Sequence, residues 1–336
     1  MRLTMAAAPL RPDRFRLDAV EPAYLVLHRD GRLADRAASA LLALERCQLC
    51  PRGCDARRLE GRVGTCGIGR NALVSSAFPH LGEEDCLRGR RGSGTVFFAG
   101  CGLRCAFCQN AGVSWLRHGE ERDAEDLAVL FLSLQAQGCH NLNLVTPSHV
   151  VPQLLEALSL AAARGLRLPV VYNSSGYDTV ETLRLLDGVV DVYMPDVKFW
   201  RAETAERYAA APDYPERARA ALLEMHRQTG PLLLGGDGLA RRGVLVRHLV
   251  MPGLVEESAA IFAWLATEVS RDTYVNVMGQ YRPEWRVGEP DGHGRRRFEE
   301  IDRRARAWEM DAAYEAARRA GLWRFDTRQL AAASGS

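Results

Sequence analysis

The feature that most constrains the fold is an alternation of short β-branched runs with longer amphipathic stretches, which starts near residue 95. Most of these runs are apolar on successive residues, as strands buried on both faces of a parallel sheet are. Strands are expected at residues 95–100, 141–146, 169–175, 189–196, 244–251 and 273–279. Helical patterns lie between them at residues 123–138, 150–165, 178–188, 215–230 and 256–270.

Strands that alternate with helices build right-handed parallel arrays. Six units are too few to close an eight-stranded barrel. We therefore expect an α/β fold, specifically a partial (β/α)6 TIM-like barrel over residues 95–285, with a cysteine-containing N-terminal extension (1–94) and a C-terminal helical segment (286–336). Within the last segment, residues 295–322 predict a charged amphipathic helix or helix pair that packs on the outside.

Charge and hydropathy exclude some classes of function. The formal charge of +2 argues against a dedicated nucleic-acid or membrane-surface binder. No window holds the roughly 18 uncharged apolar residues that a membrane span needs. The first 20 residues are interrupted by Arg and Pro, so we interpret them as a flexible leader rather than a signal peptide. The expected location is the cytoplasm.

The chain has nine cysteines, and their distribution is uneven. In a reducing cytoplasm such a number favours metal or redox chemistry over a disulfide framework. Two cysteines, Cys86 and Cys139, stand alone and are expected to be small buried hydrophobic residues. The other seven form two groups: Cys47, Cys50, Cys54 and Cys66, then Cys101, Cys105 and Cys108.

The second group has the spacing C-x3-C-x2-C and follows the first expected strand. A cubane iron–sulfur cluster has four irons, so three thiolates leave one iron open to another ligand. Gly100 and Gly102 allow the tight backbone path that wrapping a cluster requires. The alternatives are a three-thiolate zinc site and three thiols without a metal.

The stretch "CGLRCAFCQN" (101–110) resembles the signature of the radical S-adenosylmethionine superfamily, including the aromatic residue before the third cysteine. The resemblance extends over about residues 95–285, and within the superfamily the chain looks most like the pyruvate formate-lyase activating enzymes and their uncharacterised relatives. It implies a 4Fe–4S cluster whose open iron binds S-adenosylmethionine. Reductive cleavage then gives a 5′-deoxyadenosyl radical that abstracts hydrogen. The implied partners are an electron donor such as flavodoxin or ferredoxin and a glycyl radical enzyme as a protein substrate.

The resemblance also implies cofactor contacts, segment by segment. The segment "LVTPSH" stands where the family often has a Gly-Gly-Glu motif, which this chain lacks. The residues expected to contact the cofactor are Phe107, Asn110, Thr146, Asn173, Ser175, Asp196, Lys198 and His248. Alternatives stay open for several of them: Phe107 as a core residue, Asp196 and Lys198 as a surface ion pair, and His248 as a buried structural histidine. Gln280, Tyr281 and Arg282 follow the sixth strand and are further candidates for the pocket.

The first cysteine group has the spacing C-x2-C-x3-C-x11-C. Four thiolates make a closed site, which suits a structural or electron-carrying role rather than open-site catalysis. The spacing matches neither a zinc ribbon nor a ferredoxin run. A second iron–sulfur cluster, a zinc ion and four thiols without a metal all remain open.

The sequence thus predicts a radical S-adenosylmethionine enzyme that abstracts hydrogen, with activation of a glycyl radical enzyme as a candidate role. Radical modification of a small molecule or peptide is an alternative within the class. An iron–sulfur electron carrier or scaffold is the alternative from another class, although a carrier would use a fourth thiolate instead of an open iron. No motif identifies the substrate.

Overall fold

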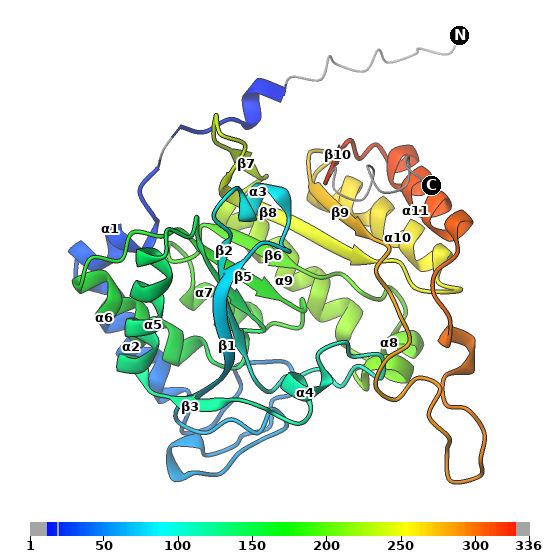
Figure 1. Cartoon of the computed structure of the whole chain (residues 1–336), viewed down its shortest axis with the longest axis horizontal. Coiled ribbons are helices and arrows are strands. Elements are labelled where there is room, and N and C mark those ends of the chain that lie inside the picture. The colour runs from blue at the N-terminus through cyan, green and yellow to red at the C-terminus, as the bar shows by residue number, and fades with distance from the viewer. Residues whose placement is uncertain (1–11, 19, 327–336) are drawn as a thin grey trace.

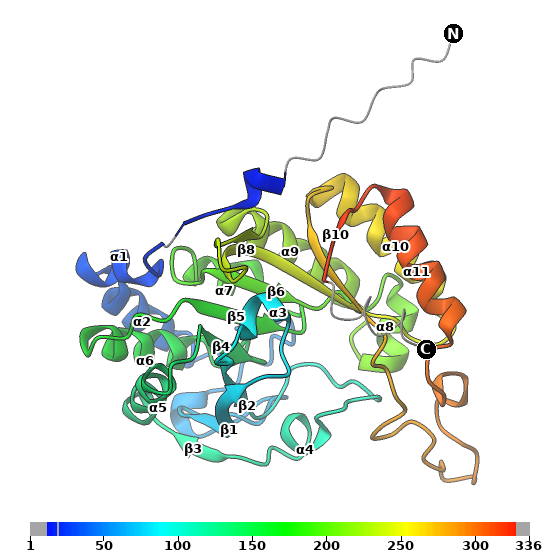
Figure 2. The ribbon, with the colours of Figure 1, turned by 45° about the horizontal axis from the view of Figure 1, so that its top comes forward.

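The computed structural model describes residues 12–18 and 20–326, so most of the expected leader lies outside the described residues. Its centre is an open sheet with the strand order β10-β9-β8-β6-β5-β4-β2-β1-β3, and β7 pairs with β8 (Figures 1 and 2). The six central strands from β2 to β9 follow chain order, and their five pairings are parallel. The fold is therefore an α/β, partial TIM-like barrel, as the alternation predicted.

The strands confirm all six predicted runs, which correspond to β2, β4, β5, β6, β8 and β9. The strand bounds are β1 (Ala72–His80), β2 (Ser93–Phe98), β3 (Glu120–Arg122), β4 (Leu142–Val145), β5 (Val170–Ser174), β6 (Val192–Pro195), β7 (Leu233–Leu234), β8 (Ala240–Leu249), β9 (Tyr274–Met278) and β10 (Arg324–Phe325).

The five predicted helical patterns correspond to α5, α6, α7, α9 and α10. The helix bounds are α1 (Tyr24–Arg29), α2 (Arg32–Leu42), α3 (Asp85–Arg88), α4 (Ala111–Ser114), α5 (Ala124–Ala136), α6 (Val151–Ala163), α7 (Val180–Leu185), α8 (Ala202–Ala209), α9 (Tyr214–Thr229), α10 (Val255–Trp264) and α11 (Ala307–Ala320).

Helix α5 shows how local sequence sets these bounds. The Asp123 carboxylate accepts a hydrogen bond from the Asp126 backbone N–H at 2.9 Å, which caps the helix start. Leu127 and Phe131 lie on the buried face of the helix. Gly138 follows with a φ of +81°, a conformation that ends helices and suits glycine. The sequence pattern alone therefore places this helix against the sheet.

The N-terminal extension shares the sheet with the barrel. Its strand β1 pairs antiparallel with β2, and its helices α1 and α2 pack against α6. The C-terminal segment adds β10 beside β9 and helix α11 against α10. The three-part division at residues 94 and 285 stays a prediction, and the extension and the barrel are joined by one continuous sheet.

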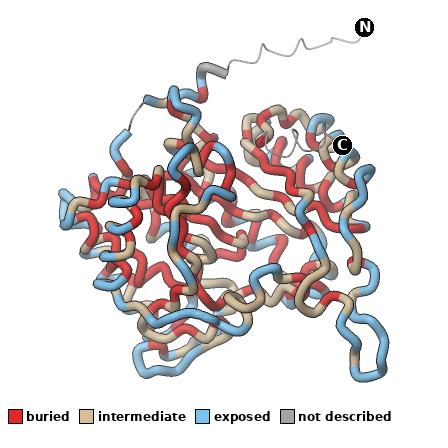
Figure 3. Tube along the Cα trace, viewed as in Figure 1, coloured by how far each residue is buried: buried red, intermediate tan, exposed pale blue. Residues whose placement is uncertain are grey.

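The chain between β9 and α11 makes an excursion away from the body of the molecule (Figure 3). Residues 292–297 at its tip are exposed. Its two roots are tied together, because the Tyr281 hydroxyl donates to the Ile301 carbonyl at 2.9 Å and both residues are fully buried. Among the described residues, no helix is long and apolar enough to cross a membrane.

Candidate functional site

A cavity of about 420 Å³ opens at the carboxyl ends of the parallel strands, where such barrels carry their chemistry. It is formed by the loop after β2 and by the ends of β4, β5, β6, β8 and β9. Ten of the residues expected from the sequence line it: Cys101, Cys105, Phe107, Cys108, Asn110, Thr146, Asn173, Ser175, Asp196 and Lys198. His248 and the four cysteines of the extension do not line it.

The cysteine loop that follows β2 is fixed by its backbone. Gly100 has a φ of +81°, and a Cβ there would lie 2.6 Å from the Cys66 carbonyl oxygen, so only glycine fits. Farther along, the Trp115 indole N–H donates to the Cys105 carbonyl at 3.2 Å. These contacts hold the loop so that three sulfur atoms face one cavity.

The three sulfurs fit a cluster better than a single ion. Among the described residues, no three His, Cys, Asp or Glu side chains are arranged around one metal ion. A zinc ion draws every thiolate to about 2.3 Å from a common point. In a cubane each thiolate binds a different iron, so such convergence is not needed.

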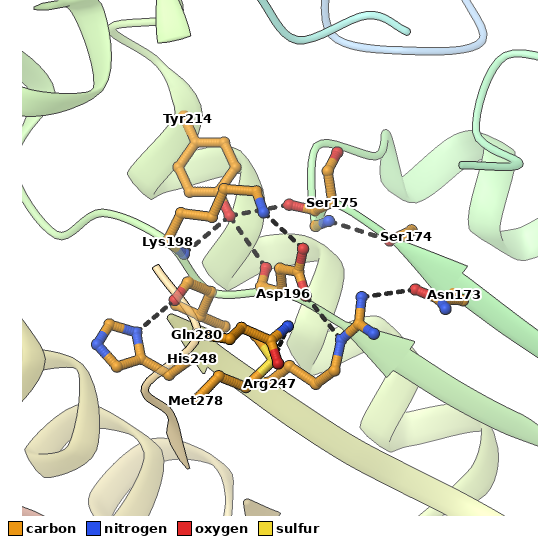
Figure 4. Close-up of polar contacts among 12 residues, drawn as sticks. Asn173, Ser174, Ser175, Asp196, Lys198, Tyr214, Arg247, His248, Met278 and Gln280 are labelled. Atoms are coloured by element: carbon orange, nitrogen blue, oxygen red, sulfur yellow. Dashed lines mark hydrogen bonds and ion pairs between the residues drawn. The ribbon is translucent and has the colours of Figure 1, made fainter. Parts of the chain in front are cut away.

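An ion-pair network lies in the cavity at the ends of β5, β6 and β8 (Figure 4). Asp196 is shared by two cations: its Oδ2 is 2.5 Å from the Lys198 Nζ, and its Oδ1 accepts from the Arg247 Nε at 2.8 Å. Arg247 also donates through Nη2 to the Asn173 side-chain oxygen at 2.7 Å. The Asp196 and Lys198 side chains are 13% and 15% exposed, so they are not a surface pair.

Burial and charge act against each other in this network. Burial alone would raise the pKa of Asp196, but Arg247 and Lys198 hold it below its usual value. Burial alone would lower the pKa of Lys198, but Asp196 holds it above its usual value. Both groups are therefore ionised at neutral pH, and one carboxylate faces two cations. Nearby, burial raises the pKa of Glu84 to about 7 against the opposing effect of Arg247.

The structure does not support the cofactor contact expected of His248. Its Nδ1 is 2.7 Å from the Val197 carbonyl and its Nε2 is 2.8 Å from the Ser258 hydroxyl, so both ring nitrogens are engaged by the protein. Burial lowers its pKa to about 4, and the ring is neutral. Adjacent side chains on a strand face opposite sides, so Arg247 faces the cavity and His248 faces α10 (Figure 4). We therefore interpret His248 as a buried structural histidine.

Phe107 is buried and also lines the cavity, so its two interpretations are compatible. Its ring lies edge-on to Phe199 with the centroids 6.1 Å apart, and 5.8 Å from the Tyr281 ring. Aromatic pairs at such distances fix ring orientation. The exposed edge of Phe107 is therefore a preorganised apolar surface in the cavity.

Thr146 occupies the end of β4, where the glycine-rich motif is missing. Its φ is +59°, in the left-handed region that costs most residues roughly 1–2 kcal/mol. Its backbone N–H donates to the Asn173 carbonyl at 2.9 Å, which continues the β4–β5 ladder past the strand ends. The conformation that glycine adopts readily is thus kept here by a threonine.

Three titratable residues that line the cavity were not among the candidates from the sequence: Arg247, His80 and Glu83. A charged residue inside the apolar run "VLVRHLVM" was the signal for Arg247. His80 ends β1, and its Nδ1 lies 3.0 Å from the Glu83 carboxylate. The extension therefore contributes to the cavity wall. Gln280 lines the cavity as expected, whereas Tyr281 is bonded to Ile301 and the Arg282 guanidinium pairs with Glu284.

Comparison with known proteins identifies the family. The model of the Radical SAM superfamily matches residues 95–265, half of the chain. The chain is also 32% identical over 281 residues to uncharacterized protein MJ0674 of Methanocaldococcus jannaschii, covering 80% of this chain and 77% of the relative.

Two solved structures are similar at low identity. One is TYW1 with a lysine-pyruvate adduct bound (11% identity, TM-score 0.30), matched over 47% of this chain and 56% of that one. The other is anSMEcpe with bound AdoMet and the Cp18Cys peptide (7% identity, TM-score 0.43), matched over 68% and 60%. The chain thus spans less than two thirds of each of these structures. On the family model and the identity to its relative, the chain belongs to the radical SAM superfamily, whose members bind a 4Fe–4S cluster and S-adenosylmethionine.

Proposed function

We propose that this protein binds a 4Fe–4S cluster through Cys101, Cys105 and Cys108 and cleaves S-adenosylmethionine reductively beside it. The observation that carries the proposal is that these cysteines line the same cavity as Lys198 and Arg247. When bound, the reduced cluster supplies one electron to the sulfonium of S-adenosylmethionine, and the resulting 5′-deoxyadenosyl radical removes a hydrogen atom from the substrate.

The protein's own residues bind and orient the cofactor. Asp196 is shared by Lys198 and Arg247, and the Arg247 Nη1 also lies 3.9 Å from the Glu84 carboxylate, so Lys198 is the cation that a carboxylate of the cofactor would meet. A methionine carboxylate is the part of the cofactor that such a site attracts, and a hydrogen bond to a charged group contributes roughly 1.5–3 kcal/mol. The Phe107 ring provides an apolar surface for adenine, and Asn173 and Ser175 present polar groups at the ribose side.

Within the superfamily we favour an activating-enzyme-like role, with a glycyl radical enzyme as substrate and a flavodoxin or ferredoxin as electron donor. The support is the resemblance of the three-cysteine loop and of the Asp196–Lys198 segment. Modification of a small molecule or peptide is the second candidate. We propose the cytoplasm as the compartment, because the nine cysteines, all among the described residues, form no disulfide, and unpaired cysteines persist where the medium is reducing.

The test is anaerobic reconstitution with iron and sulfide, reduction with dithionite, and detection of 5′-deoxyadenosine by mass spectrometry after S-adenosylmethionine is added. Cys105→Ala should abolish the product. Cys139→Ser, which alters a buried cysteine in neither group, is the matched control and should retain it. A wild-type protein with a full, reducible cluster and no 5′-deoxyadenosine would favour the electron carrier or scaffold instead.

A further inference from the structure

The four cysteines of the extension span 20 residues, and backbone contacts bring them into one part of the fold, although among the described residues no three of them are arranged around a single point. The Cys47 N–H donates to the Ala56 carbonyl at 3.0 Å and the Asp55 N–H donates to the Cys47 carbonyl at 3.1 Å, so the chain folds back and places Cys54 beside Cys47. A Cβ on Gly64 would lie 2.2 Å from the Cys54 sulfur, so the segment leading to Cys66 passes over that sulfur.

This group lies directly against the loop that carries the first cluster's cysteines. A Cβ on Gly102 would be 3.2 Å from the Cys50 sulfur, and a Cβ on Gly100 would be 2.6 Å from the Cys66 carbonyl oxygen. Cys50 and Cys66 therefore contact the backbone on both sides of Cys101. In Figure 1 the segment that carries them lies at the same end of the sheet as the loop leading to α4.

Arginines bridge the two groups. The Arg52 Nε donates to the Gly102 carbonyl at 2.7 Å, and the Arg104 guanidinium donates to the Thr65 carbonyl. The charge of Arg104 interacts with both Cys66 and Cys101, which places it between the two groups. An iron–sulfur cluster held by four thiolates is anionic, so this cationic setting favours it.

A buried donor points to a ligand at the four cysteines. Arg58 is 1% exposed and its Nη1 lies 3.6 Å from the Cys47 sulfur. The Nη2 of the same guanidinium is buried and has no hydrogen-bond partner among the described residues. A buried unsatisfied donor is costly. Sulfur atoms of a cluster accept hydrogen bonds from the protein, and such bonds set its reduction potential.

We propose that Cys47, Cys50, Cys54 and Cys66 hold a second 4Fe–4S cluster that passes electrons to the cluster at Cys101, Cys105 and Cys108. The electron-passing part rests on the function proposed above. The four cysteines lie against the loop of the first cluster, which has to receive an electron. This location favours a second iron–sulfur cluster over a zinc ion, because zinc has no redox chemistry. Four thiolates leave no open iron, so the second cluster does not bind S-adenosylmethionine.

The transfer is a one-electron exchange. An external donor, such as a reduced flavodoxin, is oxidised by one electron and the second cluster is reduced. The second cluster is then reoxidised as the first is reduced. No covalent bond forms or breaks in this exchange, and each S-adenosylmethionine cleaved consumes one such electron.

The first experiment counts metal in the wild-type protein after anaerobic reconstitution, which requires no variant to fold. We expect about eight irons and about eight sulfides per chain, from two cubanes. A count of about four irons would overturn the proposal, and so would zinc bound in place of the second four. Fully reduced protein should show the broadened EPR spectrum of two neighbouring paramagnetic clusters, and a simple single-cluster spectrum would contradict it.

The second experiment separates the two sites with two variants. Cys50→Ser/Cys54→Ser should lose about four irons and keep a single cluster whose EPR signal shifts on addition of S-adenosylmethionine. Cys54→Ser alone changes an exposed residue and serves if the double variant does not fold. Cys139→Ser is the matched control and should keep the full iron content. An unchanged iron content in both extension variants would overturn the assignment of these ligands.

The third experiment tests electron transfer. Reduction of the first cluster by flavodoxin, followed by stopped flow, should lose its fast phase in Cys54→Ser, whereas slow reduction by dithionite should still support 5′-deoxyadenosine formation. Equal flavodoxin rates in wild type and variant would overturn the relay. Failure of the proposed function looks different: wild type would then hold about eight irons and exchange electrons without forming 5′-deoxyadenosine.

Discussion

The two cysteine groups are neighbours in space, but the protein holds them in different ways. Cys101, Cys105 and Cys108 lie on a short loop that leaves β2, a buried strand that is paired on both sides in the sheet. The extension cysteines lie in a segment, residues 44–70, whose regular structure among the described residues is one 3-10 turn at Arg58–Glu60. That segment is held by arginine side chains that donate to carbonyl oxygens of distant residues.

The two cysteine groups are held in place by different kinds of contact. A sheet fixes a loop through a ladder of backbone hydrogen bonds, whose existence follows from a local apolar pattern. Arginine contacts fix a segment through single side chains that reach across the fold, and any arginine of the sequence is a candidate for such a contact. The first kind of site is therefore stable as a unit, and the second kind depends on a few residues.

The largest expected effect concerns Arg58. Its Nε donates to the Gly69 carbonyl at 3.0 Å and its Nη1 to the His149 carbonyl at 2.7 Å, so Arg58→Met leaves buried carbonyls without donors. The free energy of unfolding should fall by about 3–5 kcal/mol. Urea unfolding measures this change, with the exposed neighbour Arg57→Met as control.

Hydrogen exchange then sharpens the comparison. In Arg58→Met, residues 44–70 should exchange faster while β4, β5 and β6 keep their protection. Equal loss of protection in the segment and in these strands would show that the two regions unfold together.

The next effect concerns Lys198. Lys198→Ala removes one cation from the cavity but leaves Asp196 paired with Arg247, so the fold and the cluster should survive. Loss of a charge-assisted contact of roughly 1.5–3 kcal/mol should weaken S-adenosylmethionine binding about 10- to 150-fold. Titration against the EPR signal of the cluster measures this, and Arg201→Ala, which alters an exposed cation nearby, is the control. Unchanged affinity would mean that Lys198 only stabilises the fold. Asp196→Asn should retain the cluster and lose part of the affinity.

A smaller effect is expected when the pH is lowered, which should reduce the stability of the fold. Burial lowers the pKa of His149 and of His248 to about 4, against about 6.5 when unfolded. Between these values the unfolded state binds more protons, so stability is complete above about pH 6.5 and falls as the pH drops toward 4. At pH 5 the depressed pKa of each histidine should lower the free energy of unfolding by about 2 kcal/mol relative to neutral pH.

The two histidines have different positions relative to the segment that carries the extension cysteines. The His149 Nε2 lies 2.9 Å from the Ala99 carbonyl, and the His149 carbonyl accepts from Arg58, so this residue joins the two regions. Unfolding followed across pH 7 to 5 should show a shallower decline in His149→Asn and in His248→Asn than in wild type. A decline of unchanged slope in both variants would assign the acid sensitivity to other groups.

The smallest effect concerns Thr146. Thr146→Gly relieves a left-handed backbone conformation but adds freedom to the unfolded chain, so stability should rise by no more than about 1 kcal/mol. Ser175→Gly is the control, because the φ of Ser175 is not positive, and it should lower stability. Thermal unfolding of both variants checks the sign, and destabilisation by Thr146→Gly would show that the threonine side chain is needed for the loop.

The sequence was sufficient for the parts that depend on local pattern. It predicted six strands, five helices and the loop with Cys101, and the structure brings Asp196 and Lys198 to one cavity as the strand ends implied. It was wrong about His248, because which of two adjacent residues faces the cavity depends on strand pairing. It missed His80 because no local pattern indicates that β1 pairs antiparallel with β2 and brings its last residue to the cavity. It could not place the extension cysteines, since the contacts that position them join residues far apart in the chain.

The excursion between β9 and α11 has a consequence for proteolysis. Its tip exposes Arg295, Arg296 and Arg297, and trypsin cleaves after arginine in exposed segments. The roots are bonded through Tyr281 and Ile301, and beyond them α11 packs on α10. A single cut at the tip should therefore give two fragments that stay together through gel filtration and separate only in denaturant. The same position is suited to new chain termini or to an inserted reporter domain, because neither would disturb the sheet.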